Sequence, residues 1–314
     1  MPGGERFEGV VQTGPVFAHD VLRPLSILTW NLQYAGTRRQ HYFYDGGPAT
    51  FARPADVRDA LTAIRTVLRD ERATGLDIAL LQELDRDSAR TGRVDELREL
   101  ALDWPTWVST PYYQSRYVPF PLPPKRPMGR VDLHEAILSQ PALGPTRRVP
   151  LPLLQEPPLR QAFNLHRAIL SSRIPLSDGR HLHVATTHLS AFSRGDGTMR
   201  RQVDAVRAWM ASCGDDPFII GGDFNLLAPG DDPARLGASA AEYVEDVIGV
   251  LEAVSRRVPN LGDHTYLPPG ADAPDRTLDH VFVSPSIRIL GHRVVEVPAW
   301  VSDHLPLRVE LQLA

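Results

Sequence analysis

The chain has 314 residues, of which 42% are hydrophobic and 23% are charged, so it can bury a sizeable core. Its 34 lysines and arginines against 38 aspartates and glutamates give a formal charge of -4, which excludes a global basic field that would attract nucleic acid but allows a local basic stripe. The single cysteine, Cys213, excludes an internal disulfide and fits a reducing compartment.

Targeting signals are not evident in the sequence. Residues 1–25 lack a positively charged segment followed by an apolar one, so we expect no signal peptide. No apolar run approaches the ~18 residues needed to cross a bilayer, so we expect no transmembrane segment. These features predict a cytoplasmic protein, and no protein partner is predicted.

The first elements are a lead-in segment and a strand. Residues 1–24 contain glycines and prolines, and we expect them to precede one domain that spans residues 25–314. Leu25–Trp30 is an apolar run that predicts a buried strand, and this run stops at Asn31.

A helix and a second strand are expected next. Pro54 is placed to begin the helix, and Gly75 is placed to end it. Between them, apolar residues recur at helical spacing at Val57, Leu61, Ile64 and Leu68. The run 76–81 then predicts a strand that stops at Gln82-Glu83.

The middle of the chain is rich in proline. A helix is expected over about Val94–Trp104. The stretches 105–130 and 141–158 are expected to be surface loops on either side of a strand at Ala136–Leu138. His134-Glu135, just before that strand, is expected to be a solvated strand start.

Strands and helices alternate again in the second half. His181–Thr187 predicts a strand that stops at His188, and Met199–Met210 has helical spacing. A further helix is expected over about Ala240–Val254. Leucine and valine alternate with other residues from Leu305 to Leu313, which predicts a half-buried final strand.

The most informative motif is Gly-Gly-Asp-Phe-Asn, from Gly221 to Asn225, which follows the apolar run Pro217–Ile220. Asp223 and Asn225 are two residues apart, so an extended backbone places both side chains on one side. A carboxylate and an amide at the carboxyl end of a strand suit a hard cation, a phosphoryl oxygen or an attacking water. Gly, Asp and Asn in this order are also typical of an ordinary β-turn, so this motif alone does not establish a site.

The recurrence of polar strand ends carries the argument. Apolar runs end in polar residues six times, at Asn31, Glu83, His188, Asp223, Asp279 and Asp303-His304. Each case alone has an ordinary explanation as a cap, a solvated strand end or a core histidine. Packing alone does not explain all six together, and we therefore expect these side chains to form one site.

The residue types in this set favour phosphoester hydrolysis. Asn31, Glu83, Asp223, Asn225 and Asp303 are the oxygen ligands that Mg²⁺ prefers, with Mn²⁺ as an alternative. His304 is placed to act as a general base whose tautomer is fixed by Asp279. His188 would either stabilise the phosphorane or protonate the leaving oxygen.

The ordered set of six motifs resembles the endonuclease/exonuclease/phosphatase superfamily. The motifs are Trp30-Asn31, Gln82-Glu83, Thr187-His188-Leu189, Gly222-Asp223-Phe224-Asn225, Leu278-Asp279-His280 and Ser302-Asp303-His304-Leu305-Pro306, and the match spans about residues 25–314. The resemblance implies an α/β four-layer sandwich, in which two mixed β-sheets pack face to face with helices on the outer faces. It also implies a magnesium-dependent phosphoesterase.

The resemblance further implies roles for the site residues. Glu83 would be the main metal ligand, with Asn31 and Asp303 nearby. Asp223 and Asn225 would position the attacking water and the phosphate, or hold a second ion. The acid–base and charge-stabilising work would fall to His304 with Asp279, and to His188.

Three functional hypotheses follow. The leading one is a magnesium-dependent phosphodiester hydrolase of the nuclease type, for which Arg38-Arg39 and Tyr42–Tyr44 could contact nucleic acid. The second is a phospholipid phosphodiesterase, similar to sphingomyelinases, or a phosphomonoesterase; segment 117–122 could then meet a lipid surface. The third is a non-catalytic binding module, which predicts the loss of a ligand or acid–base residue, and none is lost.

Overall fold

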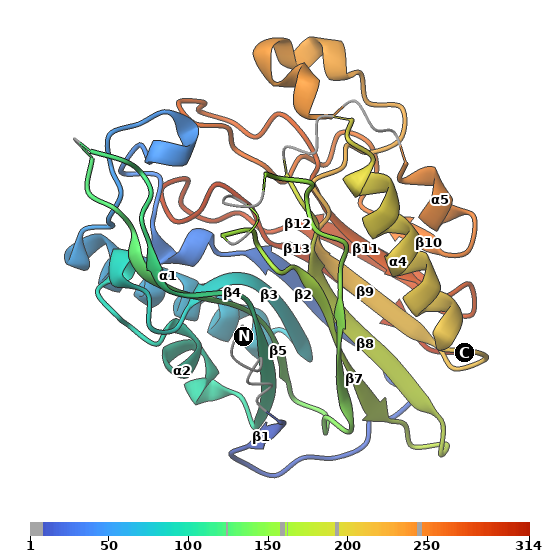
Figure 1. The fold of residues 1–314 in the computed structure, drawn as a ribbon. Helices are drawn as coiled ribbons and strands as arrows, with labels where there is room; N and C mark the ends of the chain where they lie inside the picture. Colours follow the sequence, from blue (N-terminus) through green and yellow to red (C-terminus); the bar gives the residue numbers. More distant parts are fainter. Residues whose placement is uncertain (1–8, 124, 158–160, 162, 192–194, 244–246) are drawn as a thin grey trace.

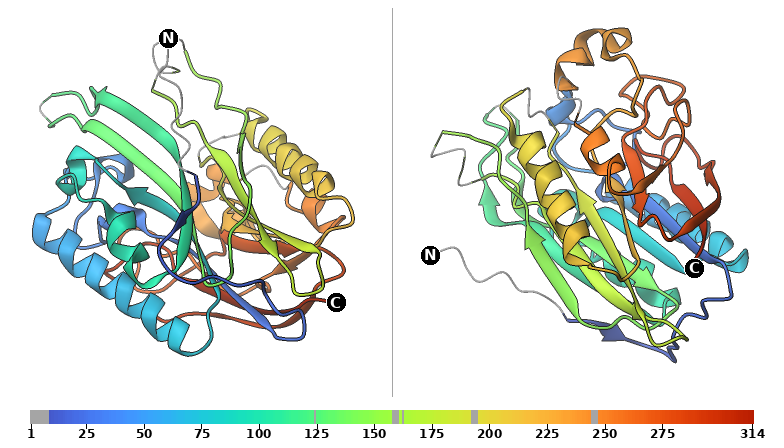
Figure 2. Two further views of the ribbon diagram at one scale, coloured as in Figure 1. Left: turned by 90° about the horizontal axis from the view of Figure 1, so that it is seen from below. Right: turned by 90° about the vertical axis from the view of Figure 1, so that its right-hand side faces the viewer.

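Two β-sheets pack face to face, and helices cover their outer faces (Figures 1 and 2). The computed structural model describes residues 9–123, 125–157, 161, 163–191, 195–243 and 247–314. Each sheet mixes parallel and antiparallel strand pairs. The architecture confirms the four-layer α/β sandwich expected from the sequence.

The seven-stranded sheet has the order β1-β4-β5-β3-β2-β13-β12. Its strands are β1 (Val11–Gln12), β2 (Leu25–Asn31), β3 (Ile78–Asp85), β4 (Thr106–Val118), β5 (Gly129–Ser139), β12 (Arg288–Val294) and β13 (Leu307–Gln312). β2 and β3 run parallel, and the other neighbours are antiparallel. β2 and β13 are therefore adjacent although they lie far apart in the sequence.

The six-stranded sheet has the order β10-β11-β9-β8-β7-β6. Its strands are β6 (Thr146–Pro150), β7 (Ala168–Pro175), β8 (His181–His188), β9 (Phe218–Asp223), β10 (Arg256–Val258) and β11 (Asp279–Val283). Only β8 and β9 run parallel. Their carboxyl ends therefore meet at one edge of the sheet, as those of β2 and β3 do in the other sheet.

The central core fills the space between the sheets. Because side chains alternate along a strand, Leu25 and Ile27 of β2 face the other sheet, whereas Leu28 and Trp30 face outwards. Opposite them, β8 contributes Val184 among other fully buried apolar residues. Burying apolar surface on both faces stabilises the sheets and fixes how they stack.

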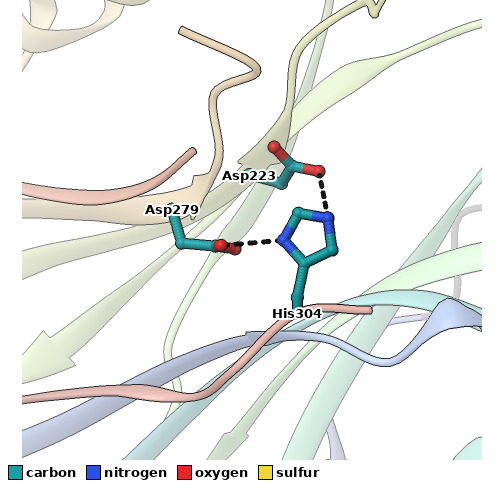
Figure 3. Close-up of side chains that lie close together, drawn as sticks. All are labelled: Asp223, Asp279 and His304. Carbon is teal, nitrogen blue, oxygen red and sulfur yellow. Dashed lines mark hydrogen bonds and ion pairs between the residues drawn. The ribbon is translucent and has the colours of Figure 1, made fainter. Parts of the chain in front are cut away.

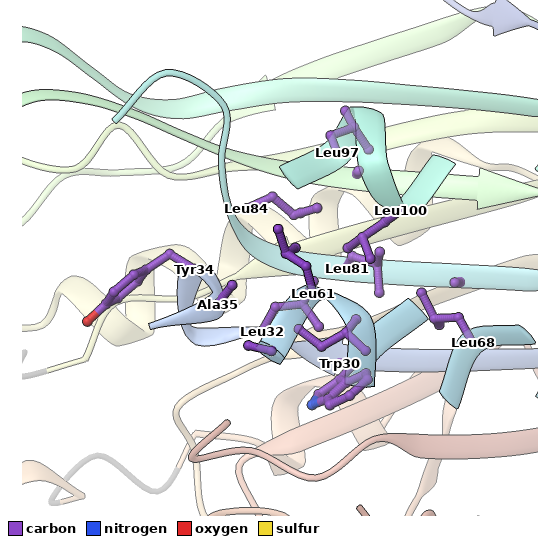
Figure 4. Close-up of a cluster of buried hydrophobic side chains, with 14 of the residues drawn as sticks. Trp30, Leu32, Tyr34, Ala35, Leu61, Leu68, Leu81, Leu84, Leu97 and Leu100 are labelled. Atoms are coloured by element: carbon purple, nitrogen blue, oxygen red, sulfur yellow. The ribbon is translucent and has the colours of Figure 1, made fainter. Parts of the chain in front are cut away.

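Helix α1 (Pro54–Ala73) covers the outer face of the seven-stranded sheet. It begins at Pro54, as expected, and its apolar stripe, which includes Leu61, Ile64 and Leu68, is buried against Trp30 and its neighbours (Figure 4). Proline is tolerated at this position because the first backbone N–H groups of a helix have no partner within it.

Helix α4 (Thr198–Ser212) covers the six-stranded sheet on the opposite side of the molecule (Figures 1 and 2). Met199, Val203 and Val206 pack there against residues of β8 and β9, including Ala185 and Ile220. No helix in the described ranges is long and apolar enough to cross a membrane.

The expectation of a surface loop over residues 105–130 was right only for the connection between Val118 and Gly129. Most of this stretch belongs to the long antiparallel hairpin of β4 and β5. Pro111 lies where the register between the two strands shifts, and such a bulge accommodates a residue that has no N–H to donate. His134 and Glu135 are buried in β5, so the expectation of a solvated strand start was also wrong.

Other boundaries differ from the sequence-based expectations. The stretch 141–158 contains β6, which pairs with β7, and is not all loop. The helix expected at Val94–Trp104 is short, with α2 at Glu96–Leu100 followed by a 3-10 turn at Ala101–Asp103.

The region expected to hold a single helix over 240–254 is also broken. It contains the end of a 3-10 segment, Pro233–Glu242, and the short α5, Gly249–Glu252, while residues 244–246 lie outside the described residues. In the lead-in segment, residues 1–8 also lie outside them, and β1 adds to the edge of a sheet by pairing with β4.

Candidate active site

The strand ends of both sheets meet in one buried cluster. In the seven-stranded sheet, Asn31 pairs in register with Gln82, next to Glu83. In the six-stranded sheet, Asp223 pairs with His188 on one side and with Asp279 on the other. The two sheets meet here, because Asn31 and Asp223, which are 192 positions apart, are joined by a hydrogen bond.

Gly222 sets the close approach of β8 and β9. A Cβ atom at this position would overlap the backbone carbonyl of Thr187 on the neighbouring strand. Only glycine avoids this overlap, and the absence of a side chain lets the two strands pair in register up to His188 and Asp223. This geometry explains why glycine precedes the aspartate in the motif.

His304 links the two sheets through Asp279 (Figure 3). Its Nδ1 atom lies 2.7 Å from Oδ2 of Asp279, and its Nε2 atom lies 3.5 Å from Oδ2 of Asp223. All three side chains are buried. The ring also packs edge-on against Tyr266, at 5.0 Å between centroids, which restricts how the imidazole can turn. The contact between Nδ1 and Asp279 thus fixes the orientation of the imidazole ring, and Nε2 points at Asp223.

A second group of polar contacts surrounds Asp223. Its Oδ2 atom lies 3.1 Å from Nε2 of His188 and accepts a 3.0 Å hydrogen bond from Nδ2 of Asn31. The same Asn31 nitrogen lies 3.3 Å from Oε1 of Glu83, which is 3.7 Å from Nδ1 of His188. The Asn31 amide therefore holds the two carboxylates close together, and its oxygen accepts a hydrogen bond from the backbone of Gln33.

Glu83 reaches this cluster because β3 bulges. The register with β5 shifts between Leu81 and Leu84, and Glu83 has a φ of 57°. A left-handed conformation is unfavourable for a residue with a side chain, and such strain concentrates at functional sites. The bulge leaves Gln82 buried between the sheets, where it donates to Thr186, while Glu83 is 22% exposed at its side chain.

Of the two remaining predicted site residues, Asn225 is bonded to the backbone and Asp303 lines a cleft. Asn225 follows the end of β9 with a φ of 50°, and its amide donates to the carbonyl of Leu189 at 3.0 Å. Its own N–H donates to Oδ1 of Asp223, so the turn orients that carboxylate. Asp303 precedes His304 and lines an adjacent cleft.

The charges of the cluster are strongly perturbed. Burial alone would raise the pKa of Asp223, but the imidazoles of His188 and His304 outweigh it and hold this pKa well below its usual range. Burial alone would lower the pKa of His304, but Asp279 and Asp223 raise it well above its usual value. Burial raises the pKa of Asp303 to about 7. Asp223, between two imidazoles, therefore keeps its charge to lower pH than Asp279 or Asp303, whose pKa values are raised.

Some side chains near the cluster were missed from the sequence. The hydroxyl of Tyr112 lies 3.5 Å from Nδ1 of His188, and Arg167 donates to the backbone carbonyl of the same histidine at 3.1 Å. Thr265 accepts from the backbone N–H of Asp279 at 3.1 Å. Their segments carry no motif, and only the packing of β4, β7 and the loop before β11 brings them here.

The donor chemistry of the cluster fits a divalent cation of the Mg²⁺ type. Glu83 and Asp303 offer carboxylate oxygens at one end of it, and the charge of Glu83 adds to the raised pKa of Asp303. Asn31 turns its amide nitrogen to Glu83, while its oxygen is bonded to the N–H of Gln33. At the other end, ligand atoms of Asp223, Asp279 and His304 lie within 4.8 Å of one another. Because His304 and Asp279 are already bonded to each other, we favour the end at Glu83 for a cation.

The fold and the cluster together define a class of protein. A two-sheet α/β sandwich that gathers carboxylates, amides and imidazoles at the ends of its central strands is the architecture of phosphoesterases. The chain belongs to the endonuclease/exonuclease/phosphatase family, whose model matches residues 28–304. The resemblance read from the six motifs is thereby confirmed.

Individual relatives are more distant. A UPF0294 protein of Yersinia pseudotuberculosis is 31% identical over 161 residues, which is 51% of this chain and 53% of the relative. The chain thus matches about half the length of this curated relative. Among solved structures, an endonuclease/exonuclease/phosphatase from Beutenbergia cavernae has a TM-score of 0.58 and 21% identity, covering 93% of this chain and 72% of the other.

A third relative has a substrate-derived ligand. The structure of D. rerio TDP2 complexed with a single-strand DNA product has a TM-score of 0.55 and 15% identity, and covers 92% of this chain and 98% of that one. At such identities the two structural matches show a shared fold.

Proposed function

We propose that this chain is a magnesium-dependent phosphodiester hydrolase. The observation that carries the proposal is the continuous cluster from Glu83 through Asn31, Asp223 and His304 to Asp279, in which each neighbour lies within 3.5 Å. Family membership and the DNA product bound by the D. rerio relative support a phosphodiester as substrate.

The cluster offers the groups that hydrolysis of such an ester needs. Water attacks phosphorus, the bond from phosphorus to the leaving alcohol oxygen breaks, and the proton of the water passes to Nε2 of His304 in its neutral form. Because Asp279 and Asp223 raise the pKa of His304, this neutral form becomes more abundant as the pH rises. Asp279 stabilises the resulting imidazolium through Nδ1. Asp223, between two imidazoles, orients the attacking water.

His188 assists from the other side of Asp223. Its Nε2 faces that carboxylate, and its ring is packed edge-on against Tyr112. It is placed to donate to a phosphoryl oxygen or to the leaving oxygen. Asn225 acts by orienting Asp223 through the turn that follows β9.

A cation would be held by the carboxylates of Glu83 and Asp303, and Asn31 would position Glu83 through its amide nitrogen. When bound, it supplies a Lewis acid for the non-bridging phosphoryl oxygens. The chain's own part is to collect these oxygen donors at the end of β2 and β3 and to keep Asp223 charged beside them.

A panel of esters tests this proposal. Single- and double-stranded DNA, RNA, sphingomyelin and bis-p-nitrophenyl phosphate are incubated with the protein in Mg²⁺ and, in parallel, in EDTA. We expect Mg²⁺-dependent release of product from at least one diester. Hydrolysis that is equally fast in EDTA would contradict the proposed cofactor, and no hydrolysis of any diester by folded protein would contradict the reaction.

A further inference from the structure

A second cleft opens beside the catalytic cluster and shares Asp303 with it. It has a volume of about 570 Å³, enough for a sugar-sized group, and its wall includes Gln33, Arg38, His41 and Asp45. The proposed hydrolysis uses only Asp303 among these residues. The other residues take no part in that reaction, and the cleft they line can hold parts of a substrate other than the reacting phosphate.

Gln33 enters this cleft from a strained turn. It lies two residues after Asn31, and the non-glycine residues Gln33, Tyr34 and Ala35 have φ angles of 48°, 42° and 48°. Consecutive left-handed residues of this kind are unfavourable and persist only where the surroundings hold them. The N–H of Gln33 donates to Oδ1 of Asn31 at 3.0 Å, and Arg90 covers the Tyr34 ring at 3.6 Å, so the turn is fixed to the catalytic strand.

The side-chain oxygen of Gln33 lacks a partner in the described part of the chain. Gln33 is 5% exposed, and its Oε1 atom has no hydrogen bond within the described part of the chain. An unpaired buried acceptor is costly, and one that lines a cleft is satisfied when a donor binds there. A strained backbone that presents an unsatisfied amide beside the catalytic groups indicates a contact made by the substrate.

The charges around the cleft decide what kind of group fits. Arg38 donates to the carbonyls of Ala299, Pro268 and Ala271 at 2.7–3.0 Å, so its guanidinium is occupied in holding two loops together. Asp45 and Asp303 add two carboxylates to the wall.

The second arginine of the wall is also engaged. Arg39 pairs with Asp56 and Asp59 at 3.1 and 2.7 Å and stacks on Trp300. With both arginines engaged and two carboxylates present, a second phosphate is disfavoured. The polar wall likewise disfavours an acyl chain.

We propose that this cleft binds an uncharged, hydroxyl-bearing part of the substrate, such as a sugar or polyol, with Gln33 Oε1 accepting a hydrogen bond from a hydroxyl. The inference rests on the proposed phosphodiester hydrolysis and narrows its substrate class. It makes Gln33 a residue that determines specificity.

Three substrates with one leaving group test the proposal. They are the p-nitrophenyl ester of thymidine 5′-monophosphate, bis-p-nitrophenyl phosphate and p-nitrophenyl phosphorylcholine. Only the first carries a sugar hydroxyl, the 3′-OH of its deoxyribose, and all three release p-nitrophenolate. The measured quantity is the ratio of kcat/KM for the thymidine ester to that for each of the other two. This ratio does not depend on how much of a variant is folded.

The variants are Gln33→Met, which keeps the length and removes the amide, and Gln33→Glu, which keeps the shape. Gln140→Met is the matched control, because Gln140 also has an unpaired buried amide atom. Gln140 directly follows β5, beside the start of β3 and away from the end of β3 that carries Glu83. We expect Gln33→Met to lower the ratio roughly ten-fold, as for the loss of one neutral hydrogen bond, mainly through KM. We expect the ratio to be unchanged in Gln140→Met. In Gln33→Glu we expect the ratio to fall less than in Gln33→Met.

An unchanged ratio in Gln33→Met, or the same fall in Gln140→Met, would overturn the inference. So would a wild-type preference for phosphorylcholine over the thymidine ester. These outcomes are distinct from failure of the proposed function, in which the wild-type protein with Mg²⁺ would release p-nitrophenolate from none of the three.

Discussion

Nδ1 of His304 and Oδ2 of Asp279 are 2.7 Å apart, and this contact joins the two sheets. Asp279 begins β11 of the six-stranded sheet, whereas His304 lies just before β13 of the seven-stranded sheet. The geometry of the proposed active site therefore depends on how the two sheets pack against each other, and not on either sheet alone.

The pairing predicts non-additive mutations. Asp279→Asn and His304→Ala should each lower kcat by at least ~100-fold, because each removes the positioned acid–base unit. The double variant should be little worse than His304→Ala alone. Kinetic measurement of the four proteins checks this, with the exposed His181→Ala as a control that retains activity. Multiplicative losses would show that the two residues act separately.

Glu83→Gln should remove Mg²⁺-dependent turnover. The substitution keeps the shape of the side chain but replaces the carboxylate that we assign as the main ligand, so Mg²⁺ affinity should fall at least ~10-fold. Titration calorimetry with Mg²⁺ and activity at increasing Mg²⁺ measure both effects. Glu99→Gln, exposed on α2, provides the control. Wild-type turnover in Glu83→Gln would refute the assignment.

Gly222→Ala should destabilise the protein by about 3 kcal/mol or more, because the added methyl overlaps the carbonyl of Thr187 and must push β8 and β9 apart. Urea unfolding measures the loss. Gly249→Ala is the control. Gly249 is the first residue of α5, and a Cβ atom added there would have no heavy atom within 4 Å. A Gly222→Ala protein as stable and active as the wild type would show that the strand spacing is not limiting.

Stability at acidic pH should depend on Glu71. Burial alone would raise the pKa of this carboxyl, but hydrogen bonds from Arg293 and Arg308 outweigh it and keep the pKa below the usual value of 4.5. A carboxyl with a lowered folded-state pKa stabilises the fold above its unfolded-state pKa, and the stabilisation disappears as the pH falls through the folded-state pKa. The free energy of unfolding should therefore decrease below about pH 4.5.

Glu71→Gln isolates this contribution. At neutral pH the variant should lose about 3 kcal/mol, because Arg308 is 6% exposed at its side chain and loses a carboxylate 2.6 Å away. The difference from wild type should shrink as the pH falls below 4.5. Asp70→Asn, exposed next to it on α1, should show no such pH dependence. A difference that stays constant with pH would rule out the ion pair as its source.

Much of the fold was predictable because local and long-range requirements agree. Leu25–Trp30 is apolar on both faces because β2 is covered by α1 on one side and by the other sheet on the other. The stripe of Leu61, Ile64 and Leu68 matches the helix that it forms. The β4–β5 hairpin was missed because prolines cluster in the connection between its strands, after Val118 and before Gly129, and this composition does not show where the flanking strands begin and end.

The site was predictable in its composition but not in its details. Polar residues at strand ends indicated which side chains meet, because the carboxyl ends of parallel strands share an edge. The roles assigned to Asn31, Asn225 and the others stay predictions. That Asn225 binds the backbone of Leu189 depends on a φ of 50° that no pattern in the sequence specifies. Tyr112 comes near His188 only through packing between the sheets.

The pairing of β2 with β13 bears on how the protein matures during synthesis. β2 is made early, yet its neighbour spans Leu307–Gln312, and the whole six-stranded sheet is translated between them. The ribosome must therefore produce His304 and the closing strand before the seven-stranded sheet can be completed. A chain that has been synthesised only as far as β11 therefore lacks the histidine that joins the two sheets.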